Sequence, residues 1–134
     1  MTVLVDTSVW SLALRRAGPE RVAEVDALAE LLRGADLVAT TGIVLQELLQ
    51  GSVRADTREL ILERFRRLTF VMPTPDDHVG AARVRTTCRE RGVQLGTVDA
   101  LIAQLCIRHG LTLLTTDGDF THAANHVPLR VWSP

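Results

Sequence analysis

Short apolar segments alternate with helical patterns along this chain, and that alternation restricts its possible folds more than any other feature. Runs rich in β-branched residues and leucine predict strands at residues 2–5, 37–39, 70–72, 112–115 and 129–132. Apolar residues at helical spacing predict helices at residues 10–14, 20–33, 41–50, 57–68, 76–91, 97–109 and 119–124. This order indicates an α/β protein whose mostly parallel sheet is covered by helices on both faces.

The length of the chain fits one domain. It has 134 residues, of which 46% are hydrophobic, and it contains no repeat or long linker, so we expect residues 1–134 to share one core. No stretch approaches the ~20 apolar residues of a membrane span, and the start lacks the basic region of a signal peptide. We therefore expect a soluble cytoplasmic protein, with Cys88 and Cys106 as buried free thiols.

The basic residues exclude several classes of enzyme. All fifteen are arginine, so the chain has neither a P-loop lysine nor a Schiff-base lysine. The net charge of −1 does not decide whether a nucleic acid is a partner.

Two acidic residues follow predicted strands directly. Asp6 follows the first strand and Asp117 follows the strand at 112–115, so parallel strands would bring both to one edge of the sheet. Capping of a helix or turn is the common alternative for either residue. Two acids in equivalent positions favour a functional site at that edge.

Two further acids lie within predicted helices. Glu47 shares a helix side with apolar Val44 and Leu48, which is costly for a carboxylate unless it is paired, metal-bound or at the edge of that side. Asp99 falls in the first helical turn after Thr97, a credible N-cap, where the helix dipole alone would explain a carboxylate.

If these four acids meet, their charges need compensation. Two like charges 4 Å apart repel by roughly 1 kcal/mol in water and about 4 kcal/mol at an effective dielectric constant of 20. Ligands that are all oxygen select a hard ion, Mg²⁺ or Mn²⁺. Such ions activate water and stabilise charge on a phosphodiester, so hydrolysis of that bond is the chemistry that fits best.

At these residues the chain resembles the PIN-domain family, and in particular the VapC toxins of bacterial toxin–antitoxin pairs. The matching segments are VDTSVW at residues 5–10, LQEL at 45–48, DALIA at 99–103 and LTTDGDF at 114–120. The resemblance covers the whole chain. It implies a three-layer α/β/α sandwich with an acidic metal site, and an endoribonuclease that depends on Mg²⁺ or Mn²⁺.

The resemblance also implies roles for individual residues and for partners. The metal-binding and catalytic acids would be Asp6, Glu47, Asp99 and Asp117. Thr7 or Ser8 would support the site by hydrogen bonding, Thr116 would steady Asp117 or hold a metal-bound water, and Asp119 would assist as a further acid unless it only caps the short helix after it. The implied partners are RNA, a cognate antitoxin and a second copy of the chain.

Arginines offer candidate contacts with RNA phosphates. We expect such contacts from Arg85 and Arg89, which share the 76–91 helix with Arg83 and Arg91, and from Arg15, near Arg16 and Arg21. A solvated helix face is the alternative explanation.

Other functions stay open. One alternative is a catalytically inactive PIN-like scaffold that acts through protein or RNA binding, and another is a general phosphatase. His122 and His126 have zinc-like spacing but no second pair of ligands accompanies them.

Overall fold

The computed structural model describes residues 1–15, 18, 21–34, 37–51 and 54–134. In this part of the chain the strands are β1 (Thr2–Val5), β2 (Leu37–Thr40), β3 (Thr69–Phe70), β4 (Thr112–Leu114) and β5 (Arg130–Val131). The helices are α1 (Thr7–Ala13), α2 (Ala23–Arg33), α3 (Gly42–Gln50), α4 (Ala55–Phe65), α5 (Pro75–Glu90), α6 (Thr97–His109) and α7 (Gly118–Ala123).

The strands form one parallel sheet. Their order is β3-β2-β1-β4-β5, and every neighbouring pair is parallel. In the centre, Leu4 of β1 lies beside Ala39 of β2 and Leu113 of β4. Because all strands run the same way, the residues that follow β1 and β4 emerge at one edge, as the sequence predicts.

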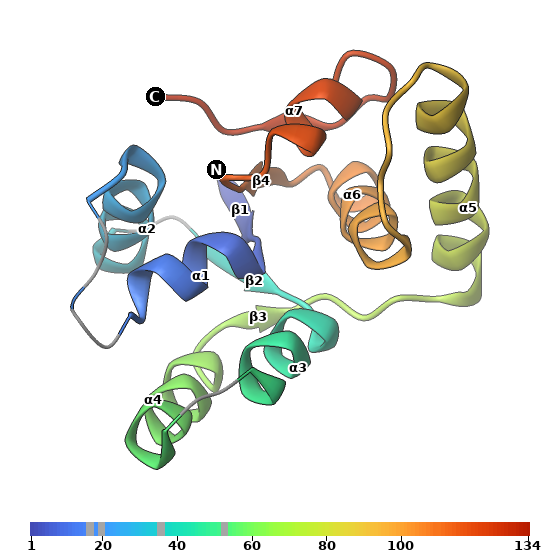
Figure 1. Ribbon diagram of the computed structural model, residues 1–134. Coiled ribbons are helices and arrows are strands. Elements are labelled where there is room, and N and C mark those ends of the chain that lie inside the picture. Colours follow the sequence, from blue (N-terminus) through green and yellow to red (C-terminus); the bar gives the residue numbers. More distant parts are fainter. Residues whose placement is uncertain (16–17, 19–20, 35–36, 52–53) are drawn as a thin grey trace.

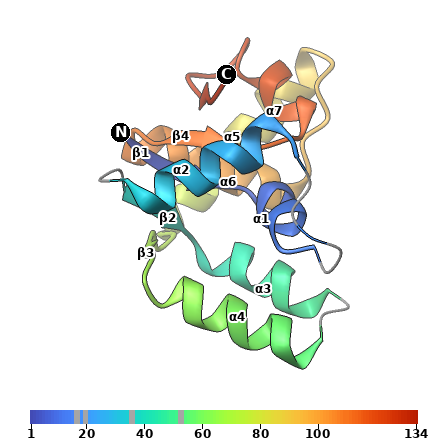
Figure 2. The same cartoon turned by 90° about the vertical axis from the view of Figure 1, so that its left-hand side faces the viewer.

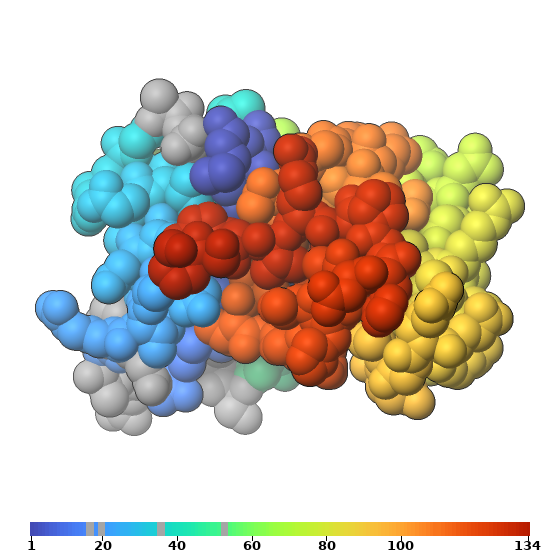
Figure 3. All heavy atoms as spheres, turned by 90° about the horizontal axis from the view of Figure 1, so that it is seen from above, coloured from blue at the N-terminus to red at the C-terminus, as the bar shows by residue number. Residues whose placement is uncertain are grey.

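Helices cover both faces of the sheet, which confirms the α/β/α sandwich. On one face lie α1 and α2, whereas α6 lies against the other face with α5 outside it (Figure 1). The pair α3 and α4 packs side by side below β3 (Figure 2). Seen from above, the chain from α7 to the C-terminus crosses the middle of the molecule between α2 and α5 (Figure 3).

Burial explains why β1 is central. Val3, Leu4 and Val5 are all 0% exposed, as expected for a strand with helices on both sides. Burying each such side chain contributes about 1.5–3 kcal/mol. Trp10 of α1 extends this core, since its ring lies 5.0 Å from the ring of Phe65 in α4.

The structure corrects one predicted helix start and one predicted helix cap. The first helix begins at Thr7 rather than residue 10, because the backbone turns into the helix directly after Asp6. The start predicted for α2 at Glu20 lies outside the described residues. The N-cap of α6 is Gly96 and not Thr97, which is already the first helical residue, so the predicted cap was wrong by one position.

The helices α5 and α6 are fastened to each other at one end by an ion pair between the buried Asp77 and Arg108, whose side chain is 38% exposed. Arg108 donates from Nε to Asp77 Oδ1 at 2.5 Å and from its terminal nitrogen to Oδ2 at 2.7 Å. Asp77 also closes a capping box with Thr74 at the start of α5. The Arg108 guanidinium holds the pKa of Asp77 well below its usual range, despite complete burial of that carboxylate.

Two further features expected from the sequence concern the cysteines and membrane spans. Cys88 and Cys106 are buried free thiols, as expected, and burial raises the pKa of both. None of the helices in the described ranges has both the length and the apolar character needed to cross a bilayer.

Candidate active site

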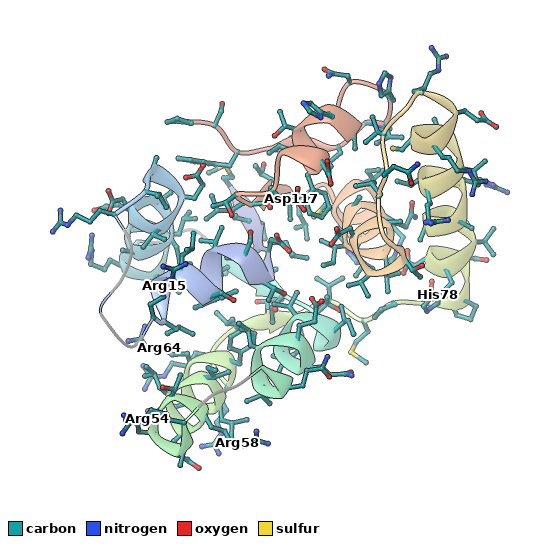
Figure 4. The ribbon with its side chains drawn as sticks, in the orientation of Figure 1. Arg15, Arg54, Arg58, Arg64, His78 and Asp117 are labelled. Carbon is teal, nitrogen blue, oxygen red and sulfur yellow. The ribbon has the colours of Figure 1, made fainter. Side chains whose placement is uncertain are left out.

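The acids singled out in the sequence come from different elements and lie around one end of the sheet. Asp6 directly follows β1, and Asp117 follows β4 as the N-cap of α7. Asp99 is the third residue of α6, and Glu47 lies in the middle of α3. Figure 4 shows Asp117 near the centre of the molecule, between α1 and α6.

The carboxylates lie close enough for their charges to act on Asp99. Its pKa is raised from 3.8 to about 6, first by burial and then by the negative charges of Asp6, Asp117, Glu47 and Asp119. The structure therefore brings all five acids into one electrostatic cluster around Asp99.

Two hydroxyl groups hold the carboxylate of Asp6, which is 6% exposed. Ser8 Oγ donates to Asp6 Oδ2 at 2.7 Å, and Thr115 Oγ1 donates to the same oxygen at 2.8 Å. No described residue donates a hydrogen bond to Oδ1. Asp6 is the N-cap of α1 by position, but its side chain caps no helical N–H, so the capping explanation does not account for it.

Thr115 is the residue that sequence reasoning missed. Besides Asp6, its Oγ1 accepts a hydrogen bond from the backbone N–H of Asp117 at 3.0 Å, so one buried hydroxyl joins the residues after β1 and β4. Steadying of Asp117 was expected from Thr116, whose side chain is exposed and whose backbone N–H donates to Ser8 Oγ at 3.2 Å. The available signal was the place of Thr115 directly after a buried strand.

Glu47 is only partly buried and is held from the neighbouring helix. Thr7 Oγ1 donates to Glu47 Oε1 at 2.9 Å, across forty positions of sequence. Thr7 and Ser8 therefore both make the supporting contacts that were expected of one of them, each to a different acid.

Asp117 has a second task besides its place in the cluster. Its Oδ1 accepts a hydrogen bond from the backbone N–H of Asp119 at 2.9 Å and so caps α7. The expectation that Asp119 could be the cap was wrong, because Asp119 lies exposed in the first turn of that helix.

The chemistry of this donor set fits a hard divalent cation. The candidate ligands are all carboxylate oxygens, which suit Mg²⁺ or Mn²⁺ rather than a softer metal. Among the described residues, no three His, Cys, Asp or Glu side chains already stand in a coordination arrangement.

The arginines expected to contact RNA lie in separate places. Arg15 follows the C-terminal end of α1, and Figure 4 shows it beside α1, on the side that faces α4. Arg89 is exposed on α5. Arg85 is partly buried, and its Nε donates to the backbone carbonyl of Leu95 at 2.9 Å. Arg16 lies outside the described residues. RNA contact by any of these side chains stays a prediction.

Comparison with known proteins agrees with this geometry. A sequence model of the PIN domain matches residues 3–125. Ribonuclease VapC23 of Mycobacterium tuberculosis is 32% identical over 117 residues, which cover 85% of this chain and 90% of that protein. Ribonuclease VapC11 of the same organism is 31% identical over 137 residues, covering 98% of each.

Solved structures show the same fold. The toxin–antitoxin complex VapBC2 of Rickettsia felis, bound to a DNA fragment from its promoter, contains a chain with a TM-score of 0.74 and 25% identity. That match covers 99% of this chain and 100% of the other. VapC20 of Mycobacterium tuberculosis superposes with a TM-score of 0.69 at 24% identity, over 96% and 98% of the two chains. The family match, the two relatives and the shared architecture together show that this chain belongs to the PIN-domain family, among its VapC proteins.

Proposed function

We propose that this chain is an endoribonuclease that depends on Mg²⁺ or Mn²⁺, with Asp6, Glu47, Asp99 and Asp117 as its metal-binding and catalytic acids. The observation that carries the proposal is the position of the acids: Asp6 and Asp117 follow the neighbouring parallel strands β1 and β4 at one edge of the sheet. Asp99 lies close enough to them that burial and their charges raise its pKa to about 6. A cluster that destabilises its own charges in this way has a strong electrostatic reason to bind a cation. The relatives named as ribonucleases supply the class of substrate.

The side chains around the acids have defined tasks in this mechanism. A bound Mg²⁺ or Mn²⁺ would supply an activated water and charge stabilisation at the scissile phosphate. Ser8 and Thr115 fix the orientation of Asp6 through Oδ2, and Thr7 fixes Glu47. Because these hydroxyls donate to carboxylate oxygens, they keep the two ligands from rotating away.

As part of the same proposal, the chain is the toxin of a type II pair and binds a cognate antitoxin. Support comes from its similarity to toxin chains solved in VapBC complexes. A cavity of about 530 Å³ between α1, α2 and α4 offers a place for such a partner. It is lined by Leu28, Leu32 and Leu60, with Arg15 and Arg64 among the residues at its wall, and Leu32 and Leu60 remain 38% and 41% exposed.

We further propose a homodimer that works in the cytoplasm. Light scattering during gel filtration measures the oligomeric state, and we expect a mass near twice 14.7 kDa. A monomer at every concentration would contradict it.

The cleavage of total cellular RNA tests the enzymatic proposal. The purified chain is incubated with Mg²⁺, with Mn²⁺ and with EDTA, beside Asp99→Asn and the matched control Asp76→Asn. Asp76 is an exposed acid in the first turn of α5, outside the cluster, so its variant removes an equivalent helix-start charge. Metal-dependent cleavage that is lost only in Asp99→Asn supports the proposal.

Other outcomes point to the alternatives. A folded, antitoxin-free chain that cleaves no RNA under any metal condition would favour the inactive scaffold. Hydrolysis of a small phosphate ester that added RNA does not inhibit would favour a phosphatase.

A further inference from the structure

Arg85 lies on α5, yet it contacts the segment that introduces α6. Its Nε donates to the carbonyl oxygen of Leu95 at 2.9 Å, and Leu95 immediately precedes Gly96, the N-cap of α6. Asp99 follows four residues after Leu95. A side chain on the outer helix therefore holds the entry into the helix that carries Asp99.

The start of α6 has no side-chain cap, as is also true of α1, α2, α3 and α4, whereas α5 and α7 have one. The N-cap of α6 is glycine, which has no side chain to bond the first helical N–H groups. By contrast, α5 starts with a complete capping box formed by Thr74 and Asp77. Without a capping side chain, the position of the first turn of α6 depends on what fixes the residues before it.

Two kinds of contact fix those residues. Leu95 and Ala100 flank the first turn of α6 and are each 2% exposed, the arrangement of a hydrophobic staple. Packing alone allows the backbone to rotate about the buried side chain. The hydrogen bond from Arg85 fixes the direction of the Leu95 carbonyl as well, and no other described side chain donates to a backbone carbonyl between Arg91 and Gly96.

We infer that Arg85 is a positioning residue, which holds the first turn of α6 so that Asp99 faces Asp6, Glu47 and Asp117. This inference rests on the metal site proposed above. It assigns Arg85 a task different from contact with RNA phosphates. The task belongs to the Nε–H group and its geometry, because this group makes the contact with the Leu95 carbonyl.

Replacing Arg85 by lysine separates the role of the Nε–H donor from the role of the positive charge. A lysine side chain places a methylene group where arginine has Nε, and its ammonium lies one atom farther out. Arg85→Lys therefore keeps the positive charge and the aliphatic stem but loses the donor to Leu95. Arg85→Met loses both, and Arg89→Met is the matched control, because Arg89 is an exposed arginine one turn along the same helix.

The test is the affinity of RNA-free protein for Mn²⁺, measured by titration calorimetry on the wild type and the three variants. Thermal unfolding of each in EDTA accompanies it. We expect Arg85→Lys and Arg85→Met to bind Mn²⁺ about 10-fold more weakly or worse, as for other groups that orient metal ligands, and Arg89→Met to bind as the wild type does. A role in overall stability alone would lower the unfolding temperature without changing the affinity for Mn²⁺.

Each remaining outcome is decisive. Wild-type affinity in folded Arg85→Lys would overturn the positioning role, as would a loss confined to RNA affinity. If the wild type itself bound no Mn²⁺, both the proposed metal site and this inference would be wrong. If the wild type bound Mn²⁺ and the Arg85 variants bound it equally well, only the inference about Arg85 would be wrong.

Discussion

Replacement of Asp99 by asparagine should stabilise the metal-free protein. In the folded chain the pKa of Asp99 is about 6, against 3.8 for the unperturbed group. A difference of about 2 units corresponds to about 3 kcal/mol. Asp99 is partly exposed, so solvent screening reduces this figure to about 1–2 kcal/mol. The variant also loses the favourable interaction of the Asp99 carboxylate with the helix dipole, which reduces the gain in stability by roughly 0.3–1 kcal/mol. The expected net gain at pH 8 is about 1 kcal/mol, or roughly 4 °C in unfolding temperature.

The sign of the pH dependence follows from the raised pKa. Between pH 3.8 and about 6 the folded chain binds more protons at Asp99 than the unfolded chain, so stability falls as pH rises through this window. The advantage of Asp99→Asn should therefore be complete above pH 6 and absent near pH 4. Thermal unfolding in EDTA at both pH values measures it, with Asp76→Asn as the control that keeps the cluster intact. A gain that persisted at pH 4, or no gain at pH 8, would refute the reasoning.

Three further predictions concern the residues that support the site and the fold. Thr115→Val should weaken Mn²⁺ binding by roughly 10–100-fold, because Asp6 loses a hydrogen-bond donor, whereas Thr116→Val should leave the affinity unchanged. Equal affinities of the two variants in titration calorimetry would contradict the different roles assigned to the two threonines. Asp77→Asn should lower the free energy of unfolding by about 2–3 kcal/mol in urea titrations at pH 7, since it breaks a buried pair whose arginine is 38% exposed. Because the pKa of Asp77 is depressed, this contribution should be complete above about pH 4 and should decline progressively as pH falls below that value. A wild-type advantage as large at pH 2 as at pH 7 would count against the pair.

The edge of the sheet that carries the acids was predictable from sequence. Alternation of strands and helices indicates a parallel sheet, and parallel strands must end at one edge, so Asp6 and Asp117 are placed by topology alone. The same logic does not give the strand order, which depends on which long-range pairs form. Nor does it place Glu47, whose neighbour Thr7 is forty positions away in the chain.

The supporting groups were harder to predict because their tasks depend on side-chain direction. Thr115 and Thr116 are chemically identical neighbours, and only the direction of the chain after β4 turns the first one inward. Arg85 read as a surface arginine in sequence, since nothing local indicates that its Nε reaches Leu95 across the loop. The start of α6 at Thr97 was predicted correctly, but its N-cap was not, for a related reason: the backbone of the preceding loop, and not the nearest Ser or Thr, decides whether Gly96 or Thr97 is the cap.

The most direct test of the account is anomalous diffraction from crystals grown or soaked with Mn²⁺. We predict an anomalous peak among the carboxylates of Asp6, Glu47, Asp99 and Asp117, and its loss in crystals of Asp99→Asn. Well-ordered wild-type crystals with no peak at these carboxylates, or with the ion bound elsewhere, would contradict the central claim that this acidic cluster is a metal site.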